Sequence, residues 1–198
     1  MSVSIEEIKR LKELTGVGLT DAKKALTEVD GDFDKALEAM RKKGLTKAEK
    51  KGEREARQGV VDTYLHSERI GVVIEVNCET DFVARTDDFK NFVHDVAMHV
   101  AAASPEYISI DDVPAEEIQA KEAEFTEKVK SEGKPENMIE QIVSGMVKKY
   151  FAEKCLLDQP FIKNPDQTIG DLLKENIAKL GENMVIRQMA RVELGAIS

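Results

Sequence analysis

The sequence of 198 residues has little of what stabilises secreted or membrane-embedded domains, with two cysteines, five prolines and no tryptophan. Cys78 and Cys155 are too few for a disulfide framework, and neither has another cysteine or histidine at zinc-finger spacing. No apolar run approaches the roughly 20 residues that cross a bilayer. The first residues are polar and acidic instead of basic and then apolar, as a signal peptide would be. We therefore expect a cytoplasmic protein without membrane spans or structural zinc.

An excess of acidic side chains limits the partners that net charge alone can attract. The chain has 29 Lys and Arg against 38 Asp and Glu, a formal charge of −9. Residues 1–58 hold 14 basic and 12 acidic side chains, whereas residues 59–198 hold 15 and 26, which indicates a boundary near residue 58. A basic face of Lys47, Lys50, Lys51 and Arg54 would form if that stretch is helical, but no aromatic residue stands among them for base stacking. We interpret residues 46–58 as a charged linker and expect no specific nucleic-acid binding.

Apolar residues at helical spacing predict three short helices in residues 1–45. Ser4 and Glu7 have the spacing of a capping box at the start of the first. Thr20 has the position of an N-cap for the second, and Gly44 that of a C-cap for the third. A turn is expected at Asp30 and Gly31, and another at Gly16 and Gly18. The predicted apolar stripes are Ile8, Leu11 and Leu14; Ala22, Ala25, Leu26 and Val29; and Phe33, Ala36, Leu37 and Met40.

Period-two alternation from residue 60 onward predicts strands. Residues 70–78 alternate with one apolar face, residues 60–65 are the expected hairpin partner, and residues 184–194 repeat the pattern. We expect these three strands to pair, because a two-stranded ribbon is barely stable in water. The intervening chain is expected to be entirely helical, with helices after Thr86, after Pro114, after Pro135 and over residues 169–180. The predicted fold class is α+β: a helical N-terminal module, then a three-stranded antiparallel sheet covered by helices in residues 59–198.

Residues that could perform catalysis do not form a convincing constellation. Gly16 and Gly18 follow a helix instead of a strand, which favours an interhelical turn over a dinucleotide loop. His94 and His99 are five apart on one helix, a spacing that does not suit a metal pair, and we expect them to be surface or partly buried. Acidic pairs precede helix starts, where carboxylates favour the helix dipole. The sequence therefore predicts neither an enzyme, nor a metal site, nor a bound cofactor.

The most informative segment is the exit of the second strand, where Thr80, Asp81, Phe82 and Val83 precede the next helix. Phe82 can fold back onto the core as part of a hydrophobic entry to that helix. For an arbitrary sequence this fold-back is the favoured interpretation, and exposure of the ring for a partner is the alternative. The pattern of residues alone leaves both interpretations open.

Three separated stretches resemble the bacterial translation elongation factor Ts family. Residues 15–26 are similar to the signature of its N-terminal module, which has a ubiquitin-associated-like three-helix fold. Residues 75–85 match a second signature over eleven consecutive positions, and residues 155–161 with 181–187 form the third. Because these stretches span most of the chain, the resemblance is specific.

The resemblance implies an exchange factor that binds the GTPase elongation factor Tu. In that family the Asp-Phe pair is exposed and is inserted beside the magnesium and phosphate site of the GTPase. This assigns Phe82 as an apolar wedge, Asp81 as a polar contact, and Thr80 and Val83 as residues that shape the turn.

The same resemblance suggests partner contacts in the N-terminal module. Leu19, Thr20 and Lys23 are the candidate residues. Core packing for Leu19 and helix capping for Thr20 remain equally open alternatives. A rival interpretation of the whole chain is a ubiquitin-associated-like adaptor or ribosome-binding module that acts through residues 1–58 without exchange activity.

The length of the chain resembles the short form of the family, because only one strand-to-helix unit of the 75–85 type is present. In the short form two chains pair to supply what one long chain contains. Residues 138–151 carry more than one apolar stripe, which suggests burial on two sides. We therefore expect a homodimer with a self-complementary surface that includes this helix.

Overall fold

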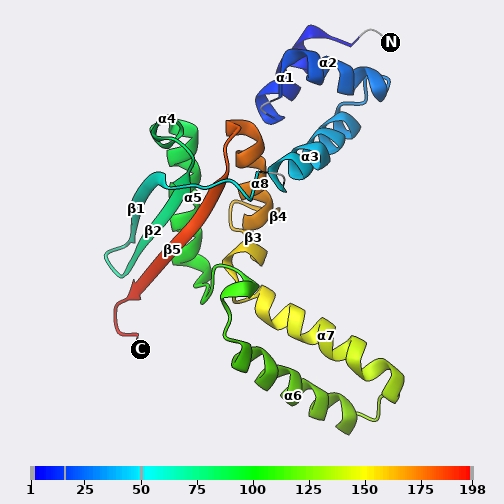
Figure 1. Ribbon diagram of the computed structural model, residues 1–198, viewed down its shortest axis with the longest axis vertical. Coiled ribbons are helices and arrows are strands. Elements are labelled where there is room, and N and C mark those ends of the chain that lie inside the picture. Colours follow the sequence, from blue (N-terminus) through cyan, green and yellow to red (C-terminus); the bar gives the residue numbers. More distant parts are fainter. Residues whose placement is uncertain (1–2, 16, 50, 197–198) are drawn as a thin grey trace. The chain divides into compact units, whose positions relative to one another are not determined.

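The structure is a computed structural model that describes residues 3–15, 17–49 and 51–196. It has the predicted α+β class, with three N-terminal helices and a three-stranded antiparallel sheet (Figure 1). The chain forms two compact units, residues 1–98 with 171–198, and residues 99–170. The division at residues 45 and 58, and the ubiquitin-associated-like character of the first helices, stay predictions.

The N-terminal helices are α1 (Ile5–Thr15), α2 (Leu19–Glu28) and α3 (Phe33–Glu49). The predicted capping box is confirmed: Glu7 N–H donates to the Ser4 hydroxyl at 3.1 Å, and Ser4 N–H donates to the Glu7 carboxylate at 3.2 Å. The predicted turn is also confirmed, with Asp30 and Gly31 at positive φ. A small apolar core joins the three helices, centred on Ile8, Leu11, Ala22, Ala25, Leu26, Ala36 and Met40.

Three local predictions in this module are wrong. Thr20 is not the N-cap of α2, because the helix begins at Leu19 and Gly18, two residues before Thr20, is the N-cap. Leu14 is 58% exposed instead of part of the core stripe. α3 does not stop at Gly44 but continues to Glu49, and the added turn buries Ala48. A glycine inside a helix costs only about 1 kcal/mol relative to alanine, which such packing offsets.

The predicted basic face is not a continuous helical surface. α3 ends at Glu49, and Lys51 lies in a turn in which its N–H donates to the carbonyl of Ala48 at 2.9 Å. Lys50, the side chain of Lys47 and the predicted turn residue Gly16 lie outside the described residues.

The main sheet has the strand order β1 (Gln58–His66), β2 (Ile70–Cys78), β5 (Met184–Glu193), all antiparallel, which confirms the predicted pairing. Ser67 and Glu68, both at positive φ, form the hairpin turn, as in type I′ geometry. The buried face of the central strand carries Val72, Ile74, Val76 and Cys78.

A β-bulge in β5 overturns the predicted facing of its second half. Val76 pairs with Ile186 and Glu75 with Gln188, so Arg187 is an extra residue between two pairs. Because side chains alternate along a strand, one inserted residue moves every later side chain to the other face. Ala190 and Val192, expected on the buried face with Ile186, are therefore exposed.

Helix α5 (Asp87–Ala103) lies on the buried face of the sheet. His94 Nδ1 on α5 lies 3.1 Å from the Asp62 carboxylate on β1, and the His94 ring contacts the Tyr64 ring edge-on. Thr86 caps α5 as predicted, since Phe89 N–H donates to its hydroxyl at 3.3 Å. Helix α8 (Ile169–Leu180) has the predicted bounds.

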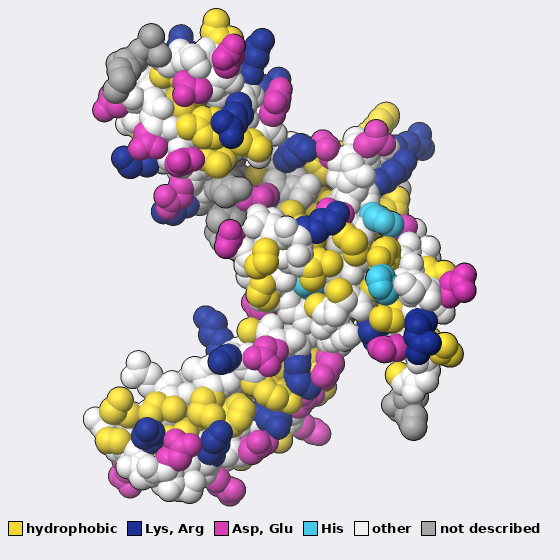
Figure 2. All heavy atoms as spheres, turned by 180° about the vertical axis from the view of Figure 1, so that it is seen from behind, with side chains coloured by type: hydrophobic (Ala, Val, Ile, Leu, Met, Phe, Trp, Pro, Cys, Tyr) yellow, Lys and Arg dark blue, Asp and Glu magenta, His cyan; other side chains and the backbone are white. Residues whose placement is uncertain are grey.

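The unit of residues 99–170 is dominated by a hairpin of helices α6 (Ala115–Ser131) and α7 (Glu136–Ala152), which follow Pro114 and Pro135 as predicted. Apolar side chains gather along this hairpin, with charged side chains beside them (Figure 2). Val143, Val147 and Phe151 of α7 are buried in a core to which α6 contributes Val129. α6 therefore covers an apolar stripe of α7 within the same chain, although Met138 is exposed.

The same unit contains strands that sequence patterns did not predict. β3 (Pro160–Phe161) and β4 (Asn164–Thr168) form a small antiparallel sheet, so the chain between β2 and β5 is not entirely helical. Short 3₁₀ turns lie over Ile110–Asp112 and Leu156–Asp158. His99 is fully buried, which corrects its expected surface or partly buried position. Throughout the described ranges, helices lack the length and apolarity that a membrane span requires.

Candidate partner-binding site

The exit of β2 leads into a single helical turn, α4 (Asp81–Ala84), which we call the tip. Thr80 is its N-cap in an extended conformation, and the Thr80 hydroxyl accepts a hydrogen bond from Val83 N–H at 3.4 Å. The four residues predicted to form one site, Thr80, Asp81, Phe82 and Val83, are thus in one capped turn. Thr86 closes it from the other end, because its hydroxyl donates to the carbonyl of Val83 at 2.7 Å.

Phe82 stands out from the tip into solvent. Its side chain is 80% exposed, the most exposed of the large apolar residues in the described chain. Ala84 is the residue of the turn that points inward and is buried. The aromatic ring packed in the core beneath the turn is that of Phe89. The fold-back interpretation of Phe82 is therefore wrong, and its exposure agrees with what the family resemblance implies.

Asp81 lies beside the ring and has a local partner. Arg85 Nη2 is 2.8 Å from the Asp81 carboxylate, one helical turn away, and both side chains are substantially exposed to water. An exposed ion pair of this kind contributes about 0–1 kcal/mol, so a partner can exchange it at little cost. The tip therefore presents one apolar ring and one accessible carboxylate on adjacent residues.

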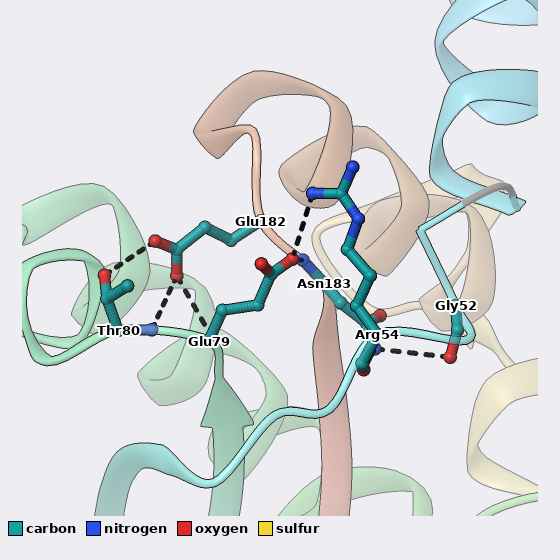
Figure 3. A network of polar contacts seen from close by, with 6 residues as sticks. All are labelled: Gly52, Arg54, Glu79, Thr80, Glu182 and Asn183. Atoms are coloured by element: carbon teal, nitrogen blue, oxygen red, sulfur yellow. Dashed lines mark hydrogen bonds and ion pairs between the residues drawn. The ribbon is translucent and has the colours of Figure 1, made fainter.

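The carboxylate of Glu182, in the turn between α8 and β5, holds the base of the tip (Figure 3). Glu182 Oε2 accepts hydrogen bonds from Glu79 N–H at 3.1 Å and from Thr80 N–H at 3.0 Å. Glu182 Oε1 accepts from the Thr80 hydroxyl at 2.6 Å. Both carboxylate oxygens are thus committed to the two residues that lead into the tip.

The contact is reciprocal. Glu79 Oε1 accepts from Asn183 N–H at 2.6 Å and lies 3.6 Å from Arg54 Nη1. The amide nitrogen of Asn183, a buried residue, donates to the carbonyls of Arg54 at 2.6 Å and Gly52 at 3.3 Å. We call the residues Gly52, Arg54, Glu79, Thr80, Glu182 and Asn183 the clasp (Figure 3).

Cys78 lies directly beneath the tip without chemical reactivity of its own. Its thiol donates to the carbonyl of Thr80 at 3.1 Å. Burial, and secondarily the Glu182 carboxylate, raises the pKa of the Cys78 thiol above its ordinary value. The thiol therefore stays protonated and serves as a packed hydrogen-bond donor.

The N-terminal candidates share one solvent-facing side of α2. Leu19 is 51% exposed, and Thr20 and Lys23 are also exposed. Core packing of Leu19 and capping by Thr20 are both ruled out as their structural roles. Thr20 and Lys23, with Lys24, Thr27 and Glu28, line a shallow hollow on this side of the helix.

Sequence patterns missed the clasp as a working part of the site. Glu182 and Asn183 lie in one of the stretches that resemble the family, but neither periodicity nor spacing predicted a role for them. Their partners are more than a hundred positions away along the chain. No set of three or more side chains suited to hold a metal ion is found in residues 3–15, 17–49 and 51–196.

The fold and the tip define a small α+β protein that presents a capped, hydrogen-bonded aromatic residue to solvent. A sequence profile of the elongation factor Ts family matches residues 4–196. Elongation factor Ts of Carboxydothermus hydrogenoformans is 52% identical over 98% of this chain and 89% of its own length. That of Moorella thermoacetica is 52% identical over 98% and 96%, and that of Alkaliphilus metalliredigens 51% over 98% and 91%. The chain belongs to the elongation factor Ts family, which implies a role in translation elongation.

Proposed function

We propose that this protein is a guanine-nucleotide exchange factor that binds elongation factor Tu in the cytoplasm and promotes release of GDP. The single observation that carries the proposal is the solvent-exposed Phe82 on a capped turn whose base is tied down by Glu182. A free protein gains nothing by exposing a large aromatic ring, whereas burying a phenylalanine in a partner is worth about 1.5–3 kcal/mol.

The tip acts on the GTPase by displacement and performs no covalent chemistry. A nucleotide bound to a GTPase depends on Mg²⁺ that bridges its phosphates and on backbone amides of the phosphate loop. Phe82 acts as an apolar wedge beside that site, and Asp81 makes the polar contact that fixes its approach. Thr80 and Val83 hold the turn in shape. The protein needs no cofactor, because binding energy alone distorts the nucleotide site.

Exchange follows from linkage between two ligands of the GTPase. The factor binds the nucleotide-free GTPase more tightly than the loaded one, so each ligand weakens the other by the same factor. The GTPase with the factor bound therefore holds GDP less tightly, and a new nucleotide that binds weakens the hold of the factor in turn.

The exposed side of α2 provides a second contact with the GTPase. Leu19 supplies apolar area, Thr20 a hydroxyl and Lys23 a positive charge, and none of the three is occupied in the core of the module. This contact contributes affinity and orientation, whereas the tip contributes the distortion. The rival function, a helical adaptor or ribosome-binding module, would use this side of α2 and leave the tip idle.

The test is release of labelled GDP from purified elongation factor Tu, with and without this protein. We expect acceleration at substoichiometric amounts, and we expect Phe82→Ala to slow release by about tenfold or more at matched occupancy of the complex. Met138→Ala removes another exposed apolar side chain, on α7, and serves as the control with unchanged release. Binding of elongation factor Tu without acceleration would favour the adaptor instead.

We also propose that two copies pair through the outer face of the main sheet, opposite α5. Large apolar residues of all three strands are exposed there: Val61 and Leu65 of β1, Val73 of β2 and Val192 of β5. Two sheets that pack face to face bury such side chains, and a self-complementary face suits a twofold dimer. This surface replaces the helix over 138–151 as the expected seat of the homodimer, because α6 already covers much of that helix.

A further inference from the structure

We infer that Glu182 is a positioning residue for exchange, one that acts through Thr80 to fix the direction in which Phe82 points. The inference rests on the proposed function and extends it to a residue outside the tip. Glu182 is inferred to act without contacting the partner itself. Its contribution is to keep the wedge in one orientation before the partner arrives.

The tip cannot hold its own geometry. α4 is four residues long, and an isolated helix of that length is unstable in water because nucleation is unfavourable. Phe82 faces solvent, so its burial does not anchor the turn to the core. Ala84 offers only a methyl group. The small buried surface of Ala84 therefore needs hydrogen bonds at the base of the turn beside it to keep the ring in one orientation.

Glu182 supplies those hydrogen bonds with unusual completeness. Its two oxygens accept from two consecutive backbone N–H groups, of Glu79 and Thr80, and from the Thr80 hydroxyl. Hydrogen bonds to a carboxylate are about twice as strong as those between neutral groups. The same Thr80 hydroxyl accepts from Val83 N–H, so it connects the carboxylate directly to the turn that carries Phe82.

The clasp prevents Glu182 itself from moving away. Asn183, the next residue, donates its backbone N–H to Glu79 and its side-chain amide to the carbonyls of Gly52 and Arg54. The two loops therefore exchange carboxylate-to-amide bonds in both directions (Figure 3). A shift of either loop would break the hydrogen bonds that both loops make. Because the clasp already orders the tip, little conformational entropy is lost when the tip binds a partner.

Two substitutions at one position separate the positioning role from simple loss of charge. Glu182→Ala deletes every bond to Glu79 and Thr80. Glu182→Gln keeps the shape: its amide oxygen can accept from both backbone N–H groups while its NH₂ donates to the Thr80 hydroxyl, which is able to accept. Glu127→Ala removes one negative charge from an exposed position on α6 and is the matched control.

The experiment measures GDP release from elongation factor Tu under single-turnover conditions, with the factor in increasing excess. We expect Glu182→Ala to lower the maximal release rate about tenfold, a smaller loss than the roughly 10²-fold that a 1 Å misplacement of a reacting group can cause. The factor concentration at half-maximal rate should change less. Glu182→Gln should keep most of the maximal rate and Glu127→Ala all of it. A variant that merely folded less well would shift the half-maximal concentration and leave the maximal rate unchanged.

A wild-type maximal rate in folded Glu182→Ala would overturn the inference, and so would a shift confined to the half-maximal concentration. If circular dichroism shows that Glu182→Ala is unfolded, Thr80→Val and Thr80→Ser decide instead. The valine lacks the hydroxyl that links Glu182 to Val83 and should lower the maximal rate, whereas serine should retain it; equal rates would overturn the inference. If the wild type accelerates GDP release and Phe82→Ala does not, the proposed function stands whatever the Glu182 variants show. If the wild type does not accelerate release, the proposed function itself is rejected.

Discussion

His99 Nε2 lies 2.9 Å from Oε1 of Gln159, and both side chains are buried in the same unit. The other ring nitrogen, Nδ1, accepts a hydrogen bond from Ile162 N–H at 3.3 Å. Because Nδ1 accepts this hydrogen bond, it carries no proton of its own, and Nε2 is the N–H donor to Gln159. The geometry therefore requires the neutral ring.

The first prediction is a loss of stability in mild acid. Burial lowers the pKa of His99 below its ordinary value of 6.5, with the bond to Gln159 opposing the shift. Below about pH 6.5 the His99 ring is protonated in the unfolded chain but stays neutral in the folded chain, which favours unfolding. The contribution of His99 to stability is therefore complete above about pH 6.5 and declines as the pH falls below it. Urea unfolding followed by circular dichroism should show a lower midpoint at about pH 5.5 than at about pH 7.5.

Two variants of the same helix isolate this effect. His99→Gln should be less stable at neutral pH but should lose less on acidification than the wild type. Asn91→Ala changes an exposed residue of α5 that does not titrate and should keep the acid dependence of the wild type. An identical pH dependence in wild type and His99→Gln would contradict the prediction.

The second prediction contrasts two phenylalanines seven positions apart. Phe82→Ala should change the free energy of unfolding by less than about 0.5 kcal/mol, because an exposed ring makes few intramolecular contacts. Phe89→Ala should cost about 3–5 kcal/mol, because it leaves a cavity beneath the sheet. Denaturant unfolding measures both. A large loss of stability in Phe82→Ala would mean that the ring packs inside the molecule.

The third prediction concerns the N-terminal contact. Leu19→Asp should fold normally, since its side chain is half exposed, and should raise the factor concentration needed for half-maximal GDP release by about tenfold. Leu14→Asp places the same charge at a comparably exposed leucine of α1 and should have little effect. Normal binding by a folded Leu19→Asp would remove α2 from the interface.

The fourth prediction addresses pairing of two copies. Analytical ultracentrifugation should show a dimer at micromolar concentration. Val192→Asp, on the outer face of β5, should shift it to monomer, because a buried carboxylate without a partner is strongly unfavourable. Val192→Thr keeps the shape and strand preference and should stay dimeric. A monomeric wild type would reject the outer sheet face as a dimer surface.

Much of the fold could be predicted because its signals are local. Alternation over residues 70–78 and 184–194 identified the strands, and Ser4 and Thr86 marked helix starts that the structure confirms. The bulge at Arg187 left no such mark, since the residues after it remain apolar at the positions expected without it. Gly44 is likewise typical of a helix C-cap, yet α3 continues through it to Glu49 because the last turn buries Ala48.

The candidate site divides in the same way. The residues of the tip were identified from a strand exit and a family signature, both contiguous in the chain. The carboxylate that holds Thr80 comes from 102 positions away, and Gln159, which makes a buried histidine tolerable, lies 60 positions from His99. Pairings at that separation leave no periodicity in either segment.

The amino-acid sequence by itself determined the three strands of the main sheet and most helix starts, because each depends on neighbours within a few positions. Only the tertiary structure decided that Phe82 points into solvent. That direction follows from Ala84 and Phe89 filling the space beneath the turn, and from the carboxylate of Glu182 holding its base. These are contacts between segments that only folding brings together.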